Sequence, residues 1–301
     1  MLFCRLSKGT CIMTWNPDQY LKFAGPRFRP AQDLLARVHH PNPKVVYDLG
    51  CGTGNVTQLL ASRWPEAQVT GVDDSASMLE KARADAPHIA WQQQSIADWS
   101  PEHPADVIFS NAALHWLGQH DTLFPRLMRC LAPGGVLAIQ MPRNFEEPSH
   151  TCVTDTIRSG PWADQLAHMI TPSPVHTPEF YYDVMSAAQA EQQARVASHT
   201  LNQPAAQTTP SAHAPIPRSG HASSLDIWET QYQQVLTGPN PVKEWTKGTW
   251  LKQFLDALTT ESDKAAFEQA YAQRVAQAYP ERTNGVTLFP FKRLFIVYNA
   301  G

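Results

Sequence analysis

The chain has 301 residues, and its 24 Lys and Arg against 27 Asp and Glu give a formal net charge of -3. That length can bury one large core with a smaller cap, and the scattered cations favour a small-molecule substrate over a nucleic acid. Five cysteines without a CxxC pair and no apolar run long enough for a membrane span predict a cytoplasmic protein with no disulfide framework, no bound metal and no membrane partner.

The N-terminal part of the chain predicts one helix after an unstructured start. Residues 1–12 lack the apolar core of a signal peptide, so we expect a disordered extension, with Met13 as a second candidate for the initiating residue. Ala31, Leu34, Leu35 and Val38 recur at helical spacing. A helix is therefore expected over 30–38, ended by the prolines at 41 and 43.

Strands and helices then alternate up to residue 141. The apolar runs predict strands at 44–49, 68–73, 89–93, 105–110 and 135–140, and helices at 55–63, 76–86 and 123–131. Short, continuously apolar strands between helices are typical of a parallel sheet covered on both faces. Residues 13–141 are thus expected to form a doubly wound α/β core of the Rossmann-like type.

The second half of the chain predicts a cap and the rest of the sheet. Residues 142–186 are expected to supply cap and connecting helices, and 187–224, rich in Ala, Gln, Ser, Thr, Pro and His, a flexible insertion. Within 225–301 we expect strands at 226–232 and 294–298, and helices at 242–258 and 262–278, with cap segments over 240–279. The expected fold is a mostly parallel seven-stranded sheet with an antiparallel edge strand and a small helical cap.

A ligand-binding loop follows the first strand of the core. Gly50, Gly52 and Gly54 let the backbone approach a ligand closely, and the following helix directs N–H groups at an anion. A dinucleotide fingerprint would need a third glycine where Asn55 stands, and no GK[ST] follows for a phosphate loop. The loop therefore favours a carboxylate-bearing ligand such as the methionyl end of S-adenosylmethionine.

Asp73 ends the second strand, beside the first, where a carboxylate can accept from both ribose hydroxyls. Asp74 is a less favoured substitute for it. A purely structural role, capping the next helix, is the alternative for Asp73, although Ser75 could serve as that cap equally well.

These motifs carry a family resemblance. The segments DLGCGTGN, GVD, DVIFSNAALHW and LAPGGVLAIQMP resemble class I methyltransferases. The segments WNPDQYLKFAGPRFRPAQDLLARV, MPRNFEEPSH, the Tyr181-Tyr182 pair and NGVTLFPFKRLFIV narrow the resemblance to the trans-aconitate 2-methyltransferases. It covers nearly everything except residues 1–12 and the low-complexity segment. It implies S-adenosylmethionine-dependent O-methylation of a carboxylate of a small polycarboxylic acid, giving a monomethyl ester.

The resemblance also implies site residues. The cofactor residues would be Tyr20, Arg29, Asp48, Gly50, Gly52, Gly54, Asp73, Met78, Ser95, Ile96, Asn111 and Trp116. For Trp116, ordinary core packing is an equal alternative. The substrate residues would be Arg29, His115, Arg143, Asn144, His150, Tyr181, Lys252 and Arg293. The cations among them would balance the substrate carboxylates in a protein of net negative charge.

Two positions depart from the family pattern. Ser95 stands where an acidic residue usually accepts from the adenine amino group, with Asp98 one turn later. Lys252 stands where the family usually has arginine, which keeps the charge but loses bidentate recognition of a carboxylate. Weaker adenine binding and a different acid are the expected consequences.

The expected chemistry needs no general base, because a carboxylic acid is ionised at neutral pH. His115 could act as a base for a hydroxyl or amine, but a role as a polar wall or hydrogen-bond donor is favoured. Two alternatives remain. One is methyl transfer to another acceptor, such as an acyl-thioester carboxylate, an isoprenoid acid, a hydroxyl or an amine. The other is a degenerate cofactor-binding protein. The sequence does not indicate an oligomeric state.

Overall fold

The computed structural model describes residues 24–201 and 223–301. Its chain divides into two compact units. The larger unit comprises Arg27–Arg143, Ser173–Tyr232 and Phe291–Gly301, and the smaller unit comprises residues 24–26, Asn144–Pro172 and Gln233–Pro290. The expected extension at 1–12 and Tyr20 lie outside the described residues.

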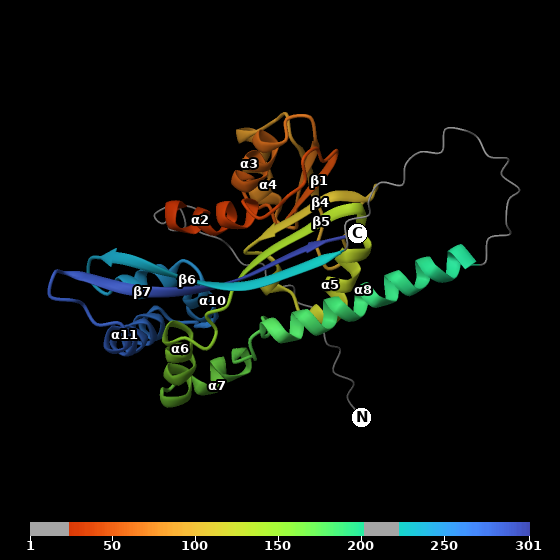
Figure 1. Ribbon diagram of the computed structural model, residues 1–301. Helices are drawn as coiled ribbons and strands as arrows, with labels where there is room; N and C mark the ends of the chain where they lie inside the picture. The colour runs from red at the N-terminus through yellow and green to blue at the C-terminus, as the bar shows by residue number, and fades with distance from the viewer. Residues whose placement is uncertain (1–23, 202–222) are drawn as a thin grey trace, which may run out of the picture. The chain divides into compact units, whose positions relative to one another are not determined.

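A seven-stranded sheet organises the larger unit, with the strand order β3-β2-β1-β4-β5-β7-β6 (Figure 1). The pairs β1–β2, β1–β4, β2–β3 and β4–β5 are parallel, and β7 runs antiparallel to β5. The strands are β1 Val45–Leu49, β2 Gln68–Asp73, β3 Ala90–Gln93, β4 Ala105–Asn111, β5 Leu131–Pro142, β6 Ser224–Thr237 and β7 Val286–Asn299. The predicted doubly wound, mostly parallel sheet is confirmed.

The helices of the larger unit follow the predicted alternation. They are α2 Ala24–Leu35, α3 Asn55–Arg63, α4 Ala76–Asp85, α5 His120–Arg129 and α8 Pro178–Leu201, with a short 3-10 turn η1 at Leu114–Trp116. The predicted bounds of α3 and β2 are confirmed to the residue. The helix predicted over 30–38 instead begins by Ala24 and includes Pro30.

The prediction of a flexible insertion over 187–224 is wrong for residues 187–201, which continue α8. Residues 202–222 of that prediction lie outside the described part of the chain. The helix packs on α5, where the rings of Phe124 and Tyr181 lie 4.8 Å apart. Its buried positions Tyr181, Met185 and Ala188 recur at helical spacing. Ala and Gln are also good helix formers, so the Ala- and Gln-rich composition of residues 187–201 is compatible with a helix.

Both faces of the sheet are covered by apolar side chains. On one face, strand residues such as Val46, Phe109 and Phe295 form a cluster with Leu34 and Leu60, which lie on α2 and α3. On the other face, the rings of Tyr47 and Trp99 form a T-shaped contact with centroids 5.0 Å apart. Burial on both faces leaves the carboxyl edge of the parallel strands as the place for a ligand.

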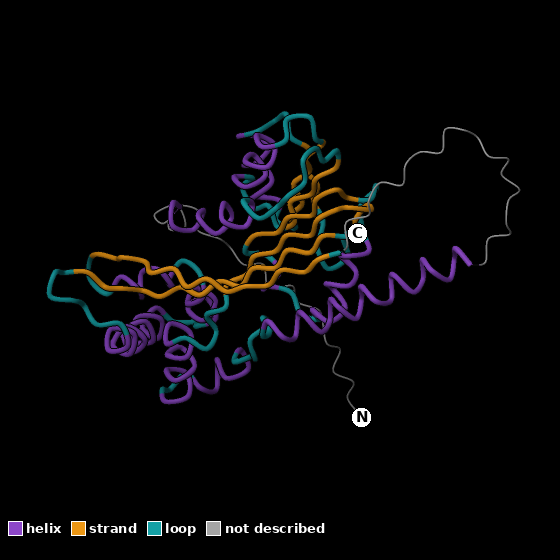
Figure 2. Tube along the Cα trace, in the orientation of Figure 1, coloured by secondary structure: helices purple, strands orange, loops and turns teal. Residues whose placement is uncertain are grey.

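The strands β6 and β7 are 14 residues long each, twice or more the predicted 226–232 and 294–298 (Figure 2). They are hydrogen-bonded neighbours, with β6 at the end of the strand order. The prediction underestimated them because polar residues interrupt the apolar pattern outside the two segments.

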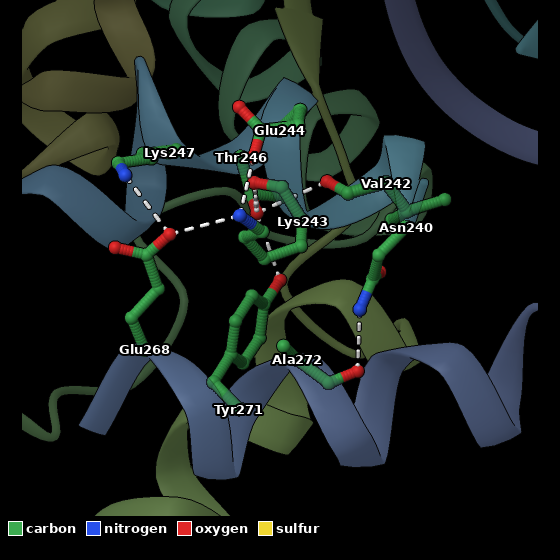
Figure 3. Close-up of polar contacts among 9 residues, drawn as sticks. All are labelled: Asn240, Val242, Lys243, Glu244, Thr246, Lys247, Glu268, Tyr271 and Ala272. Carbon is green, nitrogen blue, oxygen red and sulfur yellow. Dashed lines mark hydrogen bonds and ion pairs between the residues drawn. The ribbon is translucent and has the colours of Figure 1, made fainter. Parts of the chain in front are cut away.

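The smaller unit is mainly helical, with α6 Pro148–Ser159, α7 Ala163–Leu166, η2 Ala167–Met169, α9 Pro241–Lys247, α10 Trp250–Ala257 and α11 Glu261–Ala278. The prediction of a single helix over 242–258 is wrong, because the helix is interrupted at Gly248 and Thr249, which separate α9 from α10. Polar contacts fasten α9 to α11 (Figure 3). Glu268 accepts from Lys243 and Lys247 at 2.9 Å each, and the hydroxyls of Thr246 and Tyr271 share a hydrogen bond of 2.9 Å.

Candidate active site

The loop between β1 and α3 is tied to the end of β2. The N–H groups of Gly50 and Cys51 donate to the Val72 carbonyl at 2.8 and 3.1 Å. The Gly52 N–H donates to Oδ2 of Asp73 at 2.8 Å, and the Gly54 N–H to the Cys51 carbonyl. These four N–H groups of the loop are therefore engaged within the protein, and the expectation that the following helix α3, which begins at Asn55, directs its N–H groups at an anion stays a prediction. The loop itself offers its shape to a ligand.

The three glycines adopt the left-handed conformation, with φ of 76°, 54° and 81° for Gly50, Gly52 and Gly54. A Cβ on Gly50 would lie 2.1 Å from the Cβ of Ala113, and a Cβ on Gly54 would lie 2.3 Å from the Trp91 ring. A Cβ on Gly52 would meet nothing within 4 Å. The protein itself thus fills the space beside Gly50 and Gly54, whereas Gly52 borders an open space that a ligand can occupy.

Asp73 stands beside that space with both carboxylate oxygens held in place. Oδ2 accepts from Gly52, and Oδ1 accepts the Ser75 N–H at 2.9 Å. Burial raises the pKa of Asp73. Each oxygen still has a lone pair for a ribose hydroxyl. The capping role belongs to Ser75, whose hydroxyl accepts from the Met78 N–H, while Asp74 is exposed.

Asp48 lies fully buried at the end of β1, where its carboxylate accepts from the Thr57 hydroxyl at 2.7 Å. Burial raises the pKa of Asp48 to about 7, against the lowering effect of that hydrogen bond. A buried carboxyl with a pKa near neutrality responds strongly to a cation placed beside it. This property suits the cationic, methionyl side of S-adenosylmethionine, and the resemblance implies that Asp48 is one of the cofactor residues.

Asn111 ends β4, and the segment that follows carries His115 and Trp116. The Oδ1 of Asn111 is buried with no hydrogen-bond partner in the described part of the chain, so it is an acceptor suited to a ligand donor. The ring of the buried His115 lies 4.5 Å from that of Trp116. Trp116 is 43% exposed, so the core-packing alternative for it is wrong.

Ser95, which is expected beside the adenine, and Ile96 lie on the turn after β3. Ser95 accepts the Ala97 N–H at 3.2 Å, and Ile96 is buried beside Gly50. Met78 is half-buried on α4. Asp98 is exposed, with its backbone in the same turn as Ser95. The departure at Ser95 thus places a hydroxyl rather than a carboxylate at the end of this strand.

Two of the four predicted substrate cations converge on Tyr232 of β6. The Arg29 guanidinium lies 5.0 Å from the centroid of the Tyr232 ring and 3.7 Å from Asp33, which accepts the Tyr232 hydroxyl at 2.7 Å. Burial raises the pKa of Tyr232, and the positive charges of Arg29 and Arg293 oppose that rise. Arg293 is itself buried. Two arginines and one aspartate, Arg29, Arg293 and Asp33, therefore act on Tyr232 in the larger unit.

Arg143 and Tyr181 are engaged within the protein. Arg143 pairs with Glu229 at 2.6 Å. The Tyr181 hydroxyl is fully buried, accepts the His176 N–H at 3.2 Å and lies 2.7 Å from Nδ1 of His120. Because Nε2 of His120 faces the Leu114 carbonyl at 3.0 Å, it carries the proton, and Tyr181 donates to Nδ1. This network supports the turn that presents His115.

The smaller unit holds Asn144, His150 and Lys252. Asn144 is buried, and its carbonyl accepts the Glu147 N–H at 2.9 Å. His150 lies 4.9 Å from the Trp250 ring and 3.0 Å from the Ser149 hydroxyl, and burial lowers its pKa. Lys252 pairs with Asp256 one turn later at 2.6 Å. Asn144 begins a short turn, and His150 follows that turn. The two residues therefore lie in one short segment of the sequence.

Two residues of the larger unit were missed by the sequence analysis. Gln140 is fully buried in β5, and its position in the apolar run Val136–Met141 was the available signal. The ring of Trp91 fills the space beside Gly54. Trp91 lies on β3 and Gly54 in the loop after β1, so no local sequence pattern indicates this contact.

Similarity to known proteins assigns this site to a family. The model of a methyltransferase domain matches residues 46–135. The trans-aconitate 2-methyltransferase of Azoarcus sp. (strain BH72) is 44% identical over 284 residues, which are 94% of this chain and 98% of that protein. The chain belongs to the trans-aconitate 2-methyltransferase family. The family's enzyme from Acidovorax ebreus (strain TPSY) is 42% identical over 94% of this chain and 97% of its own.

A solved structure agrees in fold alone. Phosphoethanolamine N-methyltransferase 2 of Haemonchus contortus superposes with a TM-score of 0.50 at 13% identity, covering 94% of this chain and 57% of that one. Membership of the trans-aconitate 2-methyltransferase family confirms the prediction of a methyltransferase. Among the described residues, no group of His, Cys, Asp and Glu could hold a metal ion, and no helix is long and apolar enough to cross a membrane.

Proposed function

We propose that this protein transfers the methyl group of S-adenosylmethionine to a carboxylate of trans-aconitate, giving a monomethyl ester. The observation that carries the proposal is the extent of the similarity. The methyltransferase model matches only residues 46–135, whereas the 44% identity to the Azoarcus enzyme spans 94% of the chain. The relatives therefore share the segments expected to select the acceptor as well as those expected to bind the cofactor.

The residues of the larger unit fit S-adenosylmethionine. Asp73 would hold the ribose hydroxyls, Asp48 and the open side of Gly52 would face the methionyl group, and the unpartnered Oδ1 of Asn111 would accept from its ammonium. Met78, Ser95 and Ile96 would border the adenine, and Trp116 would adjoin the cofactor. When bound, the cofactor supplies a methyl group already activated on a cationic sulfur.

The protein's part in catalysis is placement and charge. A carboxylate oxygen forms the new C–O bond while the C–S bond breaks and its electron pair stays on sulfur, so no proton moves. Because the acid is ionised at neutral pH, no side chain has to act as a base. Arg29 and Arg293 provide positive charge for the acid on one face of the sheet, and Lys252, Arg143, Asn144 and His150 are further candidates. Holding the acid in line with the methyl group accounts for most of the catalysis required.

A methyl-transfer assay tests the proposal. Labelled S-adenosylmethionine would be supplied with trans-aconitate, cis-aconitate, saturated di- and tricarboxylic acids, fatty acids and amines. We expect the highest kcat/KM with trans-aconitate and an alkali-labile monomethyl ester as product. Preferred transfer to an amine or a fatty acid would refute the proposal that trans-aconitate is the substrate. Binding of S-adenosylmethionine with no transfer to any acceptor would indicate a cofactor-binding protein instead.

A further inference from the structure

Gln140 has a buried side-chain amide with no hydrogen-bond partner among the described residues. Its side chain is 0% exposed in β5, and neither Oε1 nor Nε2 has a hydrogen-bond partner among the described residues. Burying an amide without hydrogen bonds is unfavourable, and nearly all buried polar side chains in folded proteins have a partner. A partner that binds from outside would explain why a glutamine stands in this apolar strand.

The strand register places Gln140 between two other polar side chains. Gln140 pairs with Asn111 of β4 and with Phe295 of β7. Alternate residues of a strand share a face, so Arg293, two residues from Phe295, lies on the same face as Gln140. Asn111, Gln140 and Arg293 therefore follow one another across three neighbouring strands. The Oδ1 of Asn111 is likewise buried and unpartnered in the described chain.

The strand order indicates that Asn111 and Gln140 lie beside different ligands. Asp73 ends β2 and the glycine loop follows β1, so a cofactor with its ribose at Asp73 extends toward β4. Ligands of such sheets lie across the carboxyl ends of the strands. Beyond Asn111, the next positions on the same face belong to β5 and β7. Gln140 thus stands on the side of the acceptor, one strand past the cofactor residues.

We propose that Gln140 is a substrate-binding residue whose Nε2 donates to the carboxylate that receives the methyl group, with Arg293 as the neighbouring positive charge. This deepens the proposed function and rests on it for the identity of the acid. A neutral amide orients one carboxylate oxygen without neutralising the group, so the other oxygen remains a good nucleophile. A second guanidinium at this position would bind the acid more tightly and make it less reactive.

The test compares Gln140→Leu and Gln140→Glu with Met141→Leu, a size-conserving change on the opposite face of the same strand. Gln140→Leu should raise the KM for trans-aconitate about 10- to 100-fold with kcat changed less than about threefold, as expected for loss of a hydrogen bond to a charged group. Gln140→Glu should be worse, because it repels the acid. The affinity for S-adenosylmethionine should change less than about twofold in all three variants. The melting temperature of Gln140→Leu should be unchanged or higher, since an unpartnered amide has been replaced by an apolar group.

Three results would overturn the proposal. An unchanged KM in Gln140→Leu would exclude substrate contact. A loss of cofactor affinity equal to the loss in kcat/KM would assign Gln140 to the cofactor, and a lower melting temperature with unchanged KM would make it a structural residue.

A binding measurement separates this proposal from the proposed function. Calorimetry with tricarballylate, a saturated tricarboxylate, would be performed on the complex with S-adenosylhomocysteine. We expect binding to the wild type that weakens at least about tenfold in Gln140→Leu. Equal results for both proteins, including no binding to either, refute the role of Gln140. If trans-aconitate is not methylated but this difference is found, only the identity of the substrate is wrong.

Discussion

The carboxylate of Asp73 accepts the backbone N–H of Gly52 at 2.8 Å, so the residue expected to bind the ribose also anchors the glycine loop. Asp73→Ala should weaken S-adenosylmethionine binding at least about tenfold and lower the free energy of unfolding by about 1–3 kcal/mol, since two backbone N–H groups lose their acceptor. Calorimetry and urea unfolding measure the two effects. The exposed neighbour Asp74→Ala is the matched control and should change neither. Weaker cofactor binding in the control alone would transfer the ribose role to Asp74.

Alanine at Gly50 and at Gly52 should fail for different reasons. Gly50→Ala places its Cβ 2.1 Å from that of Ala113, so we expect a lower melting temperature that Ala113→Gly partly restores. Gly52→Ala has open space around its Cβ and should cost only the backbone strain, about 1–2 kcal/mol, while losing cofactor affinity. Thermal unfolding and cofactor titration of both variants check this. Normal cofactor binding by Gly52→Ala would place the ligand elsewhere.

Asp48 should make cofactor affinity depend on pH. Its pKa is raised to about 7 in the folded protein, so its neutral form stabilises the fold below the unfolded pKa of about 4, and this contribution is lost as the pH rises through 7. A bound cation favours the ionised carboxylate. Affinity should therefore rise by up to about tenfold per unit as the pH approaches 7 from below. Calorimetry should show this slope in the wild type, and less of it in Asp48→Asn; equal slopes would show that Asp48 does not face the cofactor's charge.

Arg29 and Arg37 form a matched pair for the substrate charge. Each guanidinium lies over an aromatic ring, Tyr232 or Trp228, and near an aspartate, at 3.7 Å for Arg29 and 3.9 Å for Arg37. Removing either should cost the fold only about 0–1 kcal/mol, because both ion pairs are exposed. Only Arg29→Ala should raise the KM for a tricarboxylate, with a smaller effect for a monocarboxylate. Equal KM values for the two variants would remove Arg29 from the substrate residues.

Tyr181→Phe should act through the turn that presents His115. The change removes the donor to His120 and the acceptor of the His176 N–H, so we expect a loss of about 1–3 kcal/mol in unfolding free energy. Because Leu114 is held by His120, kcat should fall while the KM for the acid changes little. Chemical unfolding and steady-state kinetics measure these. A raised KM at unchanged stability would instead support the substrate contact expected from the sequence.

The parts of the fold that sequence analysis predicted well are those specified locally. The bounds of α3 and β2 follow from a strand, a glycine loop and a helix in immediate succession. For α8, the low apolar content of residues 187–201 is typical of a flexible segment, whereas Tyr181, Met185 and Ala188 are spaced as one buried helical stripe that indicates the helix. Local patterns with a clear period are therefore sufficient to predict these elements.

The candidate site likewise contains residues that the sequence indicates locally and residues that depend on contacts between distant parts of the chain. Gly52 and Asp73 could be named from motif and strand position, and the structure joins them by a hydrogen bond. The link from Tyr232 to Asp33 spans 199 residues, and no sequence pattern indicates it. The unused amide of Gln140 became visible only when its neighbours were known, because a single polar residue in a strand has many structural explanations.

The ring of Trp91 limits the side-chain volume at two other positions, 54 and 71. Its ring lies where a Cβ on Gly54 would approach to 2.3 Å and a Cβ on Gly71 to 2.4 Å. In diverging members of the family, residues at 54 and 71 should thus enlarge only where residue 91 shrinks, so that these three sites evolve as one unit. A directed-evolution library that varied 91 together with 71 should yield folded enzymes at combinations that neither single substitution tolerates.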